Sequence, residues 1–163
     1  MRVKFIKIMQ KENIRPVDQN DLDTLKEIIN SNELFPPELL DNMIQPYFEG
    51  NNDTEFWVTY QENNVPIAIA YYAPERMTVG TYNLYLIAIH PNFQRKGIGQ
   101  EMLEYIENHL KNRGERILLI ETSGLPEFER AIYFYKKNNY HEEATIREFY
   151  AQEEDKIIFR KSL

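Results

Sequence analysis

The chain of 163 residues has no cysteine. Without thiols it cannot form disulfide bonds, thiolate metal sites or a cysteine nucleophile, although this absence does not identify the compartment. Its three histidines, His90, His109 and His141, are too scattered in the sequence to predict a metal site. We therefore expect chemistry that needs no metal.

The sequence also lacks long apolar runs and an excess of positive charge. No run reaches the roughly 18 apolar residues of a membrane span. Arg2, Lys4 and Lys7 interrupt the apolar residues of 1–11, so no secretory signal is expected. The net charge of −7 argues against nucleic acid as a partner and weakly favours a cationic substrate such as an amine. We expect a cytoplasmic protein without membrane contact, with a single domain over residues 1–163.

Residues 84–112 predict a strand, a glycine turn and a helix in succession. The apolar run 84–89 ends at His90 and is typical of a strand buried on both faces. After the turn, apolar side chains recur at four-residue steps while polar ones fill the other side, which predicts an amphipathic helix. The apolar stripe is formed by Ile98, Met102, Ile106 and Leu110. Gly114 is suited to a left-handed cap at the end of this helix.

The turn itself is residues 94–99, Gln-Arg-Lys-Gly-Ile-Gly. A helix N-terminus presents main-chain N–H groups without intrahelical partners, and nearby glycines let an anion approach the main chain closely. The turn therefore predicts a phosphate-binding site. Two common nucleotide motifs are excluded, because no Gly-Lys-Ser/Thr follows and because Met102 stands where the dinucleotide motif has its third glycine.

Gln94-x-x-Gly97-x-Gly99, placed after a strand and a His-Pro turn, resembles the acetyl-coenzyme A signature of the GNAT superfamily of N-acetyltransferases. The pattern of that family is Gln/Arg-x-x-Gly-x-Gly/Ala. Embedded between a buried strand and an amphipathic helix, this six-residue match becomes specific enough to predict the family.

A second similarity to the family lies in Ala131-x-x-x-Tyr135, in the fourth expected helix. Asn139 stands where the family usually has glycine, and asparagine also enters the left-handed region at modest cost. The tail at 144–150 looks like the closing hairpin of bacterial members, including the ribosomal-protein alanine acetyltransferases. The resemblance therefore covers nearly the whole chain.

The remaining segments predict the element order β α α β β β α β α β β, which is that of the GNAT fold. Strands are expected at 13–17, 54–61, 65–72, 81–89, 116–121, 144–151 and 156–160. Pro36 and Pro37 open the second helix, which should end or kink at Pro46. The expected class is α/β of the α+β type. The resemblance implies a mixed, mostly antiparallel sheet whose central parallel pair is splayed around acetyl-CoA.

The resemblance implies acetyl-CoA as the cofactor and assigns its contacts to two segments. The main chain of Ile87, Ala88 and Ile89 would hydrogen-bond the pantetheine arm as a pseudo-strand, and an N–H near Ile89 would face the carbonyl oxygen. The pyrophosphate would be held by the N–H groups of Arg95, Lys96, Gly97, Ile98, Gly99 and Gln100. The side chains of the two basic residues either add charge against the phosphates or point into water.

Acetyl transfer to an amine needs a donor for the departing thiolate and an acceptor for the amine proton. The resemblance places Tyr135 beside the sulfur as the donor, and the alternative role for this side chain is packing. Glu121 ends a buried strand at the acidic position used as base in alanine acetyltransferases, with a water or a plain surface charge as alternatives. Glu75 is a second, weaker candidate. Those relatives carry asparagine seven residues before their tyrosine, whereas this chain has Phe128.

The function predicted from these residues is transfer of an acetyl group from acetyl-CoA to a primary amine, by direct attack in a ternary complex. A non-catalytic acyl-CoA-binding sensor or regulatory module is the alternative. The acceptor is left open among small molecules, peptide N-termini and lysines, as are acyl groups other than acetyl and a homodimer. A thiol-release assay over an amine panel separates enzyme from sensor.

Overall fold

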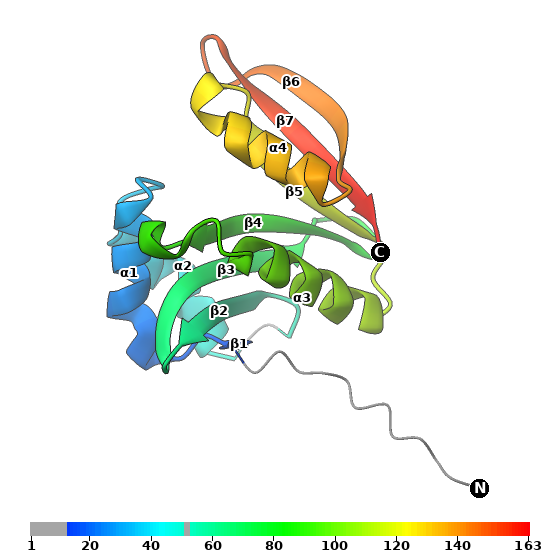
Figure 1. Cartoon of the computed structure of the whole chain (residues 1–163). Coiled ribbons are helices and arrows are strands. Elements are labelled where there is room, and N and C mark those ends of the chain that lie inside the picture. Colours follow the sequence, from blue (N-terminus) through cyan, green and yellow to red (C-terminus); the bar gives the residue numbers. More distant parts are fainter. Residues whose placement is uncertain (1–12, 51–52) are drawn as a thin grey trace, which may run out of the picture.

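Residues 13–50 and 53–163 are described by the computed structural model of the chain, and the expectation for 1–11 lies outside them. In this part of the chain seven strands form one mixed sheet in the order β1-β2-β3-β4-β5-β7-β6 (Figure 1). The strands are β1 Ile14–Pro16, β2 Phe56–Glu62, β3 Val65–Pro74, β4 Thr81–Ile89, β5 Ile117–Ser123, β6 His141–Ala151 and β7 Glu154–Ser162. The helices are α1 Leu22–Ser31, α2 Leu39–Phe48, α3 Ile98–Asn112 and α4 Glu129–Lys137. The expected element order and GNAT-type topology are confirmed.

Helices cover the sheet on both faces, and each face has its own apolar core. On one face α1 and α2 bury side chains against β2, β3 and β4. On the other face α3 and α4 pack over the sheet through a larger cluster (Figure 1). The stripe expected on α3 is buried from Ile98 to Leu110. Full burial of each such side chain stabilises the fold by about 1.5–3 kcal/mol, which is what docks the helices.

Short polar segments form the turns that the sequence predicts. Asp18 caps the η1 turn (Gln19–Asp21) before α1 through a capping box with Asp21. Gly114 has φ of 84° after α3, and Asn139 has φ of 66° after α4, so both adopt the left-handed conformation expected of them. Because these conformations depend on local chemistry alone, the sequence is sufficient to predict them.

The prediction that α2 opens at Pro36 and Pro37 is wrong, and α2 does not end at Pro46. The helix starts at Leu39 rather than at Pro36, and it continues through Pro46 to Phe48. A proline in the last turn removes only one hydrogen bond, and its lost partner, the Asn42 carbonyl, belongs to an exposed residue that water can reach. Burial of Ile44 holds this end of the helix in place.

The central parallel pair of strands separates after a few residues. β4 and β5 pair only from Thr81–Ile117 to Leu84–Ile120, after which β5 continues to pair with β7 alone. At the same level β4 has a bulge in its pairing with β3, where Tyr85 is the extra residue. The outer halves of β4 and β5 therefore diverge, as expected, and leave a wedge-shaped gap in the sheet.

No helix in the two described stretches is long and apolar enough to span a membrane.

Candidate functional site

The edge of β4 that faces the gap carries main-chain groups without a strand partner. The His90 N–H donates to the Ile67 carbonyl, toward β3, at 2.8 Å. Because successive residues of a strand direct their main-chain groups to alternate edges, Ile87 presents its N–H and C=O to the gap and Ile89 presents its N–H, while the Ile89 carbonyl accepts from two side chains. This edge can hydrogen-bond an extended ligand as a further strand would.

The turn before α3 forms a concave cluster of N–H groups. Arg95 and Gly97 are left-handed, with φ of 61° and 83°, and Lys96 between them is not. Such alternation turns successive N–H groups toward one point and makes an anion-binding nest. The first main-chain bond of the helix runs from the Glu101 N–H to the Gly97 carbonyl, and Gly97 makes no side-chain cap. The N–H groups of residues 98–100 are thus available to a ligand.

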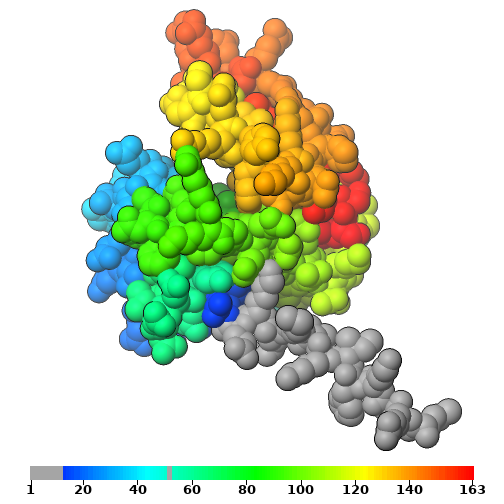
Figure 2. Space-filling model, viewed as in Figure 1, coloured from blue at the N-terminus to red at the C-terminus, as the bar shows by residue number. Residues whose placement is uncertain are grey.

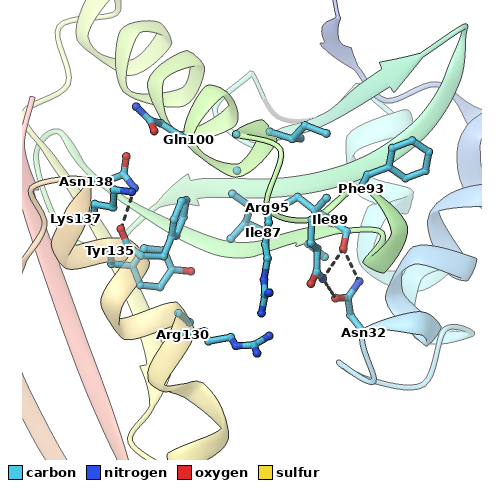
Figure 3. A pocket seen from close by; sticks show the side chains of 17 residues that line it. Asn32, Ile87, Ile89, Phe93, Arg95, Gln100, Arg130, Tyr135, Lys137 and Asn138 are labelled. Carbon is cyan, nitrogen blue, oxygen red and sulfur yellow. Dashed lines mark hydrogen bonds between the residues drawn. The ribbon is translucent and has the colours of Figure 1, made fainter.

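Side chains from α1 and the turn hold this nest against β4. Asn32 donates from Nδ2 to the Ile89 carbonyl at 3.1 Å, and Gln94 donates from Nε2 to the same oxygen at 3.0 Å. Gln94 also donates to Asn32 Oδ1 at 3.1 Å (Figure 3). These three bonds fix the position of the turn relative to the open strand edge.

A cavity of about 570 Å³, here called the cofactor-side cavity, lies between this turn and α4 (Figure 3). Its basic residues are Arg95 from the turn and Arg130 and Lys137 from α4, and none of its lining residues is acidic. The side chains of Arg95 and Arg130 extend into the space between the two elements (Figure 3). In a chain with a net charge of −7, this wall is locally positive and suits an anion.

Gly99 borders the cofactor-side cavity where α3 approaches α4. A Cβ added there would lie 3.1 Å from Phe134 Cζ and 3.3 Å from Ile89 Cδ1. A Cβ at Gly97 would meet nothing within 4 Å, so Gly97 is required for its left-handed φ and Gly99 for close packing.

Tyr135 lies where the cofactor-side cavity meets a second one. Its side chain is 7% exposed and lines both cavities. Its ring packs against Phe159 and Tyr140, but the described residues offer its hydroxyl no hydrogen-bond partner. Burial raises the pKa of Tyr135 to about 12, so the side chain remains a neutral phenol that can donate a proton.

The second cavity, here called the acceptor-side cavity, has a volume of about 440 Å³ and opens between the diverging ends of β4 and β5. Ile87, Ala131 and Tyr135 line both cavities, which makes them two mouths of one passage. Figure 2 shows the surface hollowed between the segment of β4 and the turn, in green, and α4, in yellow. The lining of the acceptor-side cavity contains Glu121 and Glu154 and no basic residue. The two mouths therefore carry charges of opposite sign.

Two comparisons with known proteins bear on this geometry. The profile of the acetyltransferase (GNAT) family matches residues 22–140, which is well over half of the chain. The chain belongs to the GNAT acetyltransferase family. No curated protein sequence matches it significantly.

Several solved structures have a fold similar to that of this GNAT chain. A protein from Desulfovibrio desulfuricans described as a GNAT acetyltransferase is 29% identical, with a TM-score of 0.83 over 91% of this chain and 97% of its own. The ribosomal-protein-S18-alanine N-acetyltransferase of Escherichia coli is 22% identical, with a TM-score of 0.73 over 91% and 92%. An aminoglycoside 6′-N-acetyltransferase complexed with coenzyme A is 16% identical, with a TM-score of 0.74 over 91% and 96%. The last two share the fold.

The residues of this GNAT chain suit coenzyme A. The nest at 94–97 and the free N–H groups of α3 match a pyrophosphate, and the open space above Gly97 lets it approach. The side chains of Arg95 and Arg130 suit ion pairs with further phosphate groups. The open edge of β4 suits hydrogen bonds with the amide groups of the pantetheine arm. The described residues contain no group of three or more His, Asp or Glu side chains arranged to hold a metal.

Most site residues expected from the sequence of this GNAT chain line the cofactor-side cavity. They are Ile87, Ala88, Ile89, Arg95, Gly97, Ile98, Gly99, Gln100 and Tyr135. Lys96 does not line it, because its Nζ lies over the Phe93 ring, 5.2 Å from the centroid. The sequence motifs did not identify Arg130, which stands one helical turn before Phe134 on α4.

Glu121 lines the acceptor-side cavity of this GNAT chain, on the opposite side of the passage from the turn. Its Oε2 lies 2.8 Å from Lys156 Nζ, and this lysine is itself buried and lies over the Phe149 ring at 3.6 Å from the centroid. Phe128 lines the same cavity rather than the cofactor-side one. The position that is asparagine in the alanine acetyltransferases therefore belongs to the acceptor wall here.

Proposed function

We propose that this protein transfers the acetyl group of acetyl-CoA directly to a primary amine in a ternary complex. The observation that carries the proposal is the hydroxyl of the buried residue Tyr135, which has no hydrogen-bond partner among the described residues and stands at the junction of a positive cavity and a negative one. A phenol in that place can donate to a departing thiolate between a phosphate-bearing ligand and a cationic one. Packing alone does not require the hydroxyl.

Acetyl-CoA supplies an acyl group already activated as a thioester. The main chain of Ile87 and Ile89 aligns the extended arm along β4, and the N–H groups of residues 95–100 hold the pyrophosphate. An N–H near Ile89 stabilises the negative charge that develops on the carbonyl oxygen. Tyr135 donates its proton to the sulfur as the carbon–sulfur bond breaks, while the amine nitrogen bonds to the carbonyl carbon.

The amine must lose a proton on the acceptor side, and Glu121, the base expected from the sequence, lines that cavity. Its ion pair with Lys156 neutralises part of its charge, which lowers its attraction for a positive group. We therefore propose that the proton leaves through water beside Glu121. Glu121→Gln should lower kcat/KM mainly below neutral pH, where less of the amine is uncharged, and an unchanged pH profile would remove Glu121 from this role.

Direct attack is supported by the absence of cysteine, the residue best suited to carry an acyl group between two half-reactions. The test is a thiol-release assay over a panel of amines that includes peptides with free N-termini, lysine peptides and aminoglycosides. Initial rates at varied concentrations of both substrates should give intersecting lines. Parallel lines would indicate an acyl-enzyme, and binding of acetyl-CoA without thiol release on any amine would favour the sensor.

The cytoplasmic location and the assignment of residues 1–163 to one catalytic domain stay predictions. The same holds for the absence of nucleic-acid partners. Gel filtration of the full chain would test the homodimer that the sequence leaves open.

A further inference from the structure

Tyr85 is displayed in the acceptor-side cavity by the bulge where β4 leaves β5. It has no register partner on β3, since Leu84 pairs with Tyr72 and Leu86 pairs with Tyr71. The side chain is 50% exposed and lines the cavity. Bulges beside active sites commonly re-aim one side chain, so this position is a candidate for substrate recognition.

The ring of Tyr85 is held by an aromatic ladder. It stacks on Tyr71 at 5.7 Å between centroids, and Tyr71 stacks on the buried Trp57 at 4.2 Å. A ring fixed in this way loses little freedom when a ligand binds to it. The exposed face of the Tyr85 ring is therefore preorganised for ligand binding.

The hydroxyl of Tyr85 has a defined direction of hydrogen bonding. It donates to Glu75 Oε1 at 2.9 Å, and the same oxygen accepts from Asn83 Nδ2 at 2.8 Å. Because its only proton is committed to Glu75, the phenol oxygen can offer a ligand nothing but lone pairs. Asn83 is 1% exposed, and its Oδ1 is a buried acceptor with no partner among the described residues. Apart from the second N–H of the Asn83 amide, the unused hydrogen-bonding groups of this cluster are acceptors.

The charge of this cluster is also uncompensated. Within the described stretches Glu75 makes no ion pair, and neither does Glu154, which lines the cavity. Glu121, by contrast, is paired with Lys156. The acceptor-side cavity thus presents the unpaired carboxylate of Glu154 and the ring of Tyr85, and Glu75 lies directly behind the Tyr85 hydroxyl. A carboxylate on each side of an aromatic ring suits a cation.

We propose that Tyr85 and Glu75 form a subsite for a second positive group of the acceptor, separate from the amine that is acetylated. The acceptor is then an amine that carries a further ammonium or guanidinium group. This inference rests on the proposed function, because it assigns one end of the acceptor to Tyr135 and the other to Tyr85. The second charge can belong to a small diamine or to a lysine or arginine side chain near a peptide N-terminus.

The first test measures binding, which does not depend on turnover. The full chain saturated with coenzyme A is titrated in a calorimeter with 1,4-diaminobutane, 1,6-diaminohexane and the matched monoamines 1-aminobutane and 1-aminohexane. We expect at least one diamine to bind about tenfold more tightly than its monoamine. Glu75→Gln and Tyr85→Phe should reduce this preference to about twofold or less, whereas Glu143→Gln, on the exposed strand β6, should preserve it.

The second test distinguishes the sources of the charge. Tripeptides with a free N-terminus and lysine, arginine or norleucine at the second position are compared in the same titration and by kcat/KM in thiol release. A preference for lysine or arginine that is lost in Glu75→Gln, without a diamine preference, assigns the subsite to peptides. Equal affinity for charged and uncharged members in both series overturns the proposal, as does a preference that survives Glu75→Gln. If diamines or charged peptides bind selectively but no thiol is released, the subsite stands and the proposed function fails.

Discussion

Replacing Tyr135 by phenylalanine separates the chemistry of this side chain from its packing. The ring fills the same volume between Phe159 and Tyr140, and only the hydroxyl is lost. Since that hydroxyl has no hydrogen-bond partner among the described residues, no bond is broken by the change. The free energy of unfolding should therefore change by no more than about 1 kcal/mol.

The effect on turnover should be much larger. If the phenol donates to the leaving thiolate, its loss should lower kcat by about 10² to 10⁴, which corresponds to about 2.7–5.5 kcal/mol in the barrier. Affinity for coenzyme A should change far less, because the lost interaction exists mainly in the transition state. With its pKa raised to about 12 by burial, Tyr135 also should not limit the rate on the alkaline side below about pH 11.

The assay is thiol release at saturating acetyl-CoA with an acceptor from the amine panel, combined with calorimetry of coenzyme A and urea unfolding. Tyr140→Phe is the matched control, because Tyr140 is 2% exposed, packs against Tyr135 and donates to Glu107 at 2.8 Å outside both cavities. It should lose about 1.5–3 kcal/mol of stability and keep its kcat. Wild-type kcat in a folded Tyr135→Phe variant would refute the reasoning and leave Tyr135 a packing residue.

Three further predictions follow from the same geometry. Acetyl-CoA should stabilise the fold by about 2.7 kcal/mol at one hundred times its Kd, and an unchanged Tm at millimolar concentration would contradict the cofactor assignment. Gly99→Val should abolish measurable coenzyme A binding and lower Tm slightly, because its Cβ would crowd Phe134; retained affinity would place the phosphate elsewhere. Burial, and less so Arg113, lowers the pKa of His109, whose Nδ1 lies 2.7 Å from the Tyr72 hydroxyl. The unfolded chain therefore binds more protons, so stability should fall as pH drops below about 6.5. Urea unfolding from pH 5 to 8 should show a slope that His109→Gln reduces.

The fold could be predicted because its strongest signals are local. The apolar run of β4, the stripe of α3 and the left-handed residue Asn139 each depend on neighbours within a few positions. The extension of α2 through Pro46 could not be predicted from the sequence. The helix continues there because Ile44 packs against strands that are distant in the sequence. Strand ends were also extended by pairing, as at β6, which begins at His141 rather than at 144.

The sequence predicted those parts of the candidate site that main-chain groups form, and it missed those that depend on side chains from distant segments. A glycine turn at a helix N-terminus favours anions through its own main-chain groups, so the motif is sufficient to predict where such a site would lie. The pairing of Glu121 with Lys156 depends on the register of β5 against β7, which brings Lys156 opposite Ser123. The sequence also does not show that basic residues line one cavity and acidic residues the other, because these residues come from different elements of the fold.

An unpaired strand edge is ordinarily a hazard, because its free N–H and C=O groups can recruit another chain and start aggregation. Among the described strands, this sheet has such edges at its two borders, β1 and β6, and another in its interior. The border strand β6 is exposed along its whole length and carries charges such as Glu142, Glu143, Arg147 and Glu148, which discourage a second strand. The inner edge, on β4, is apolar and unprotected by charge, but it is recessed between α4 and the turn at 94–97. Any molecule that pairs with the inner edge must therefore fit between α4 and this turn. The kind of edge that promotes aggregation at a border is thus restricted in the interior to ligands that fit this recess.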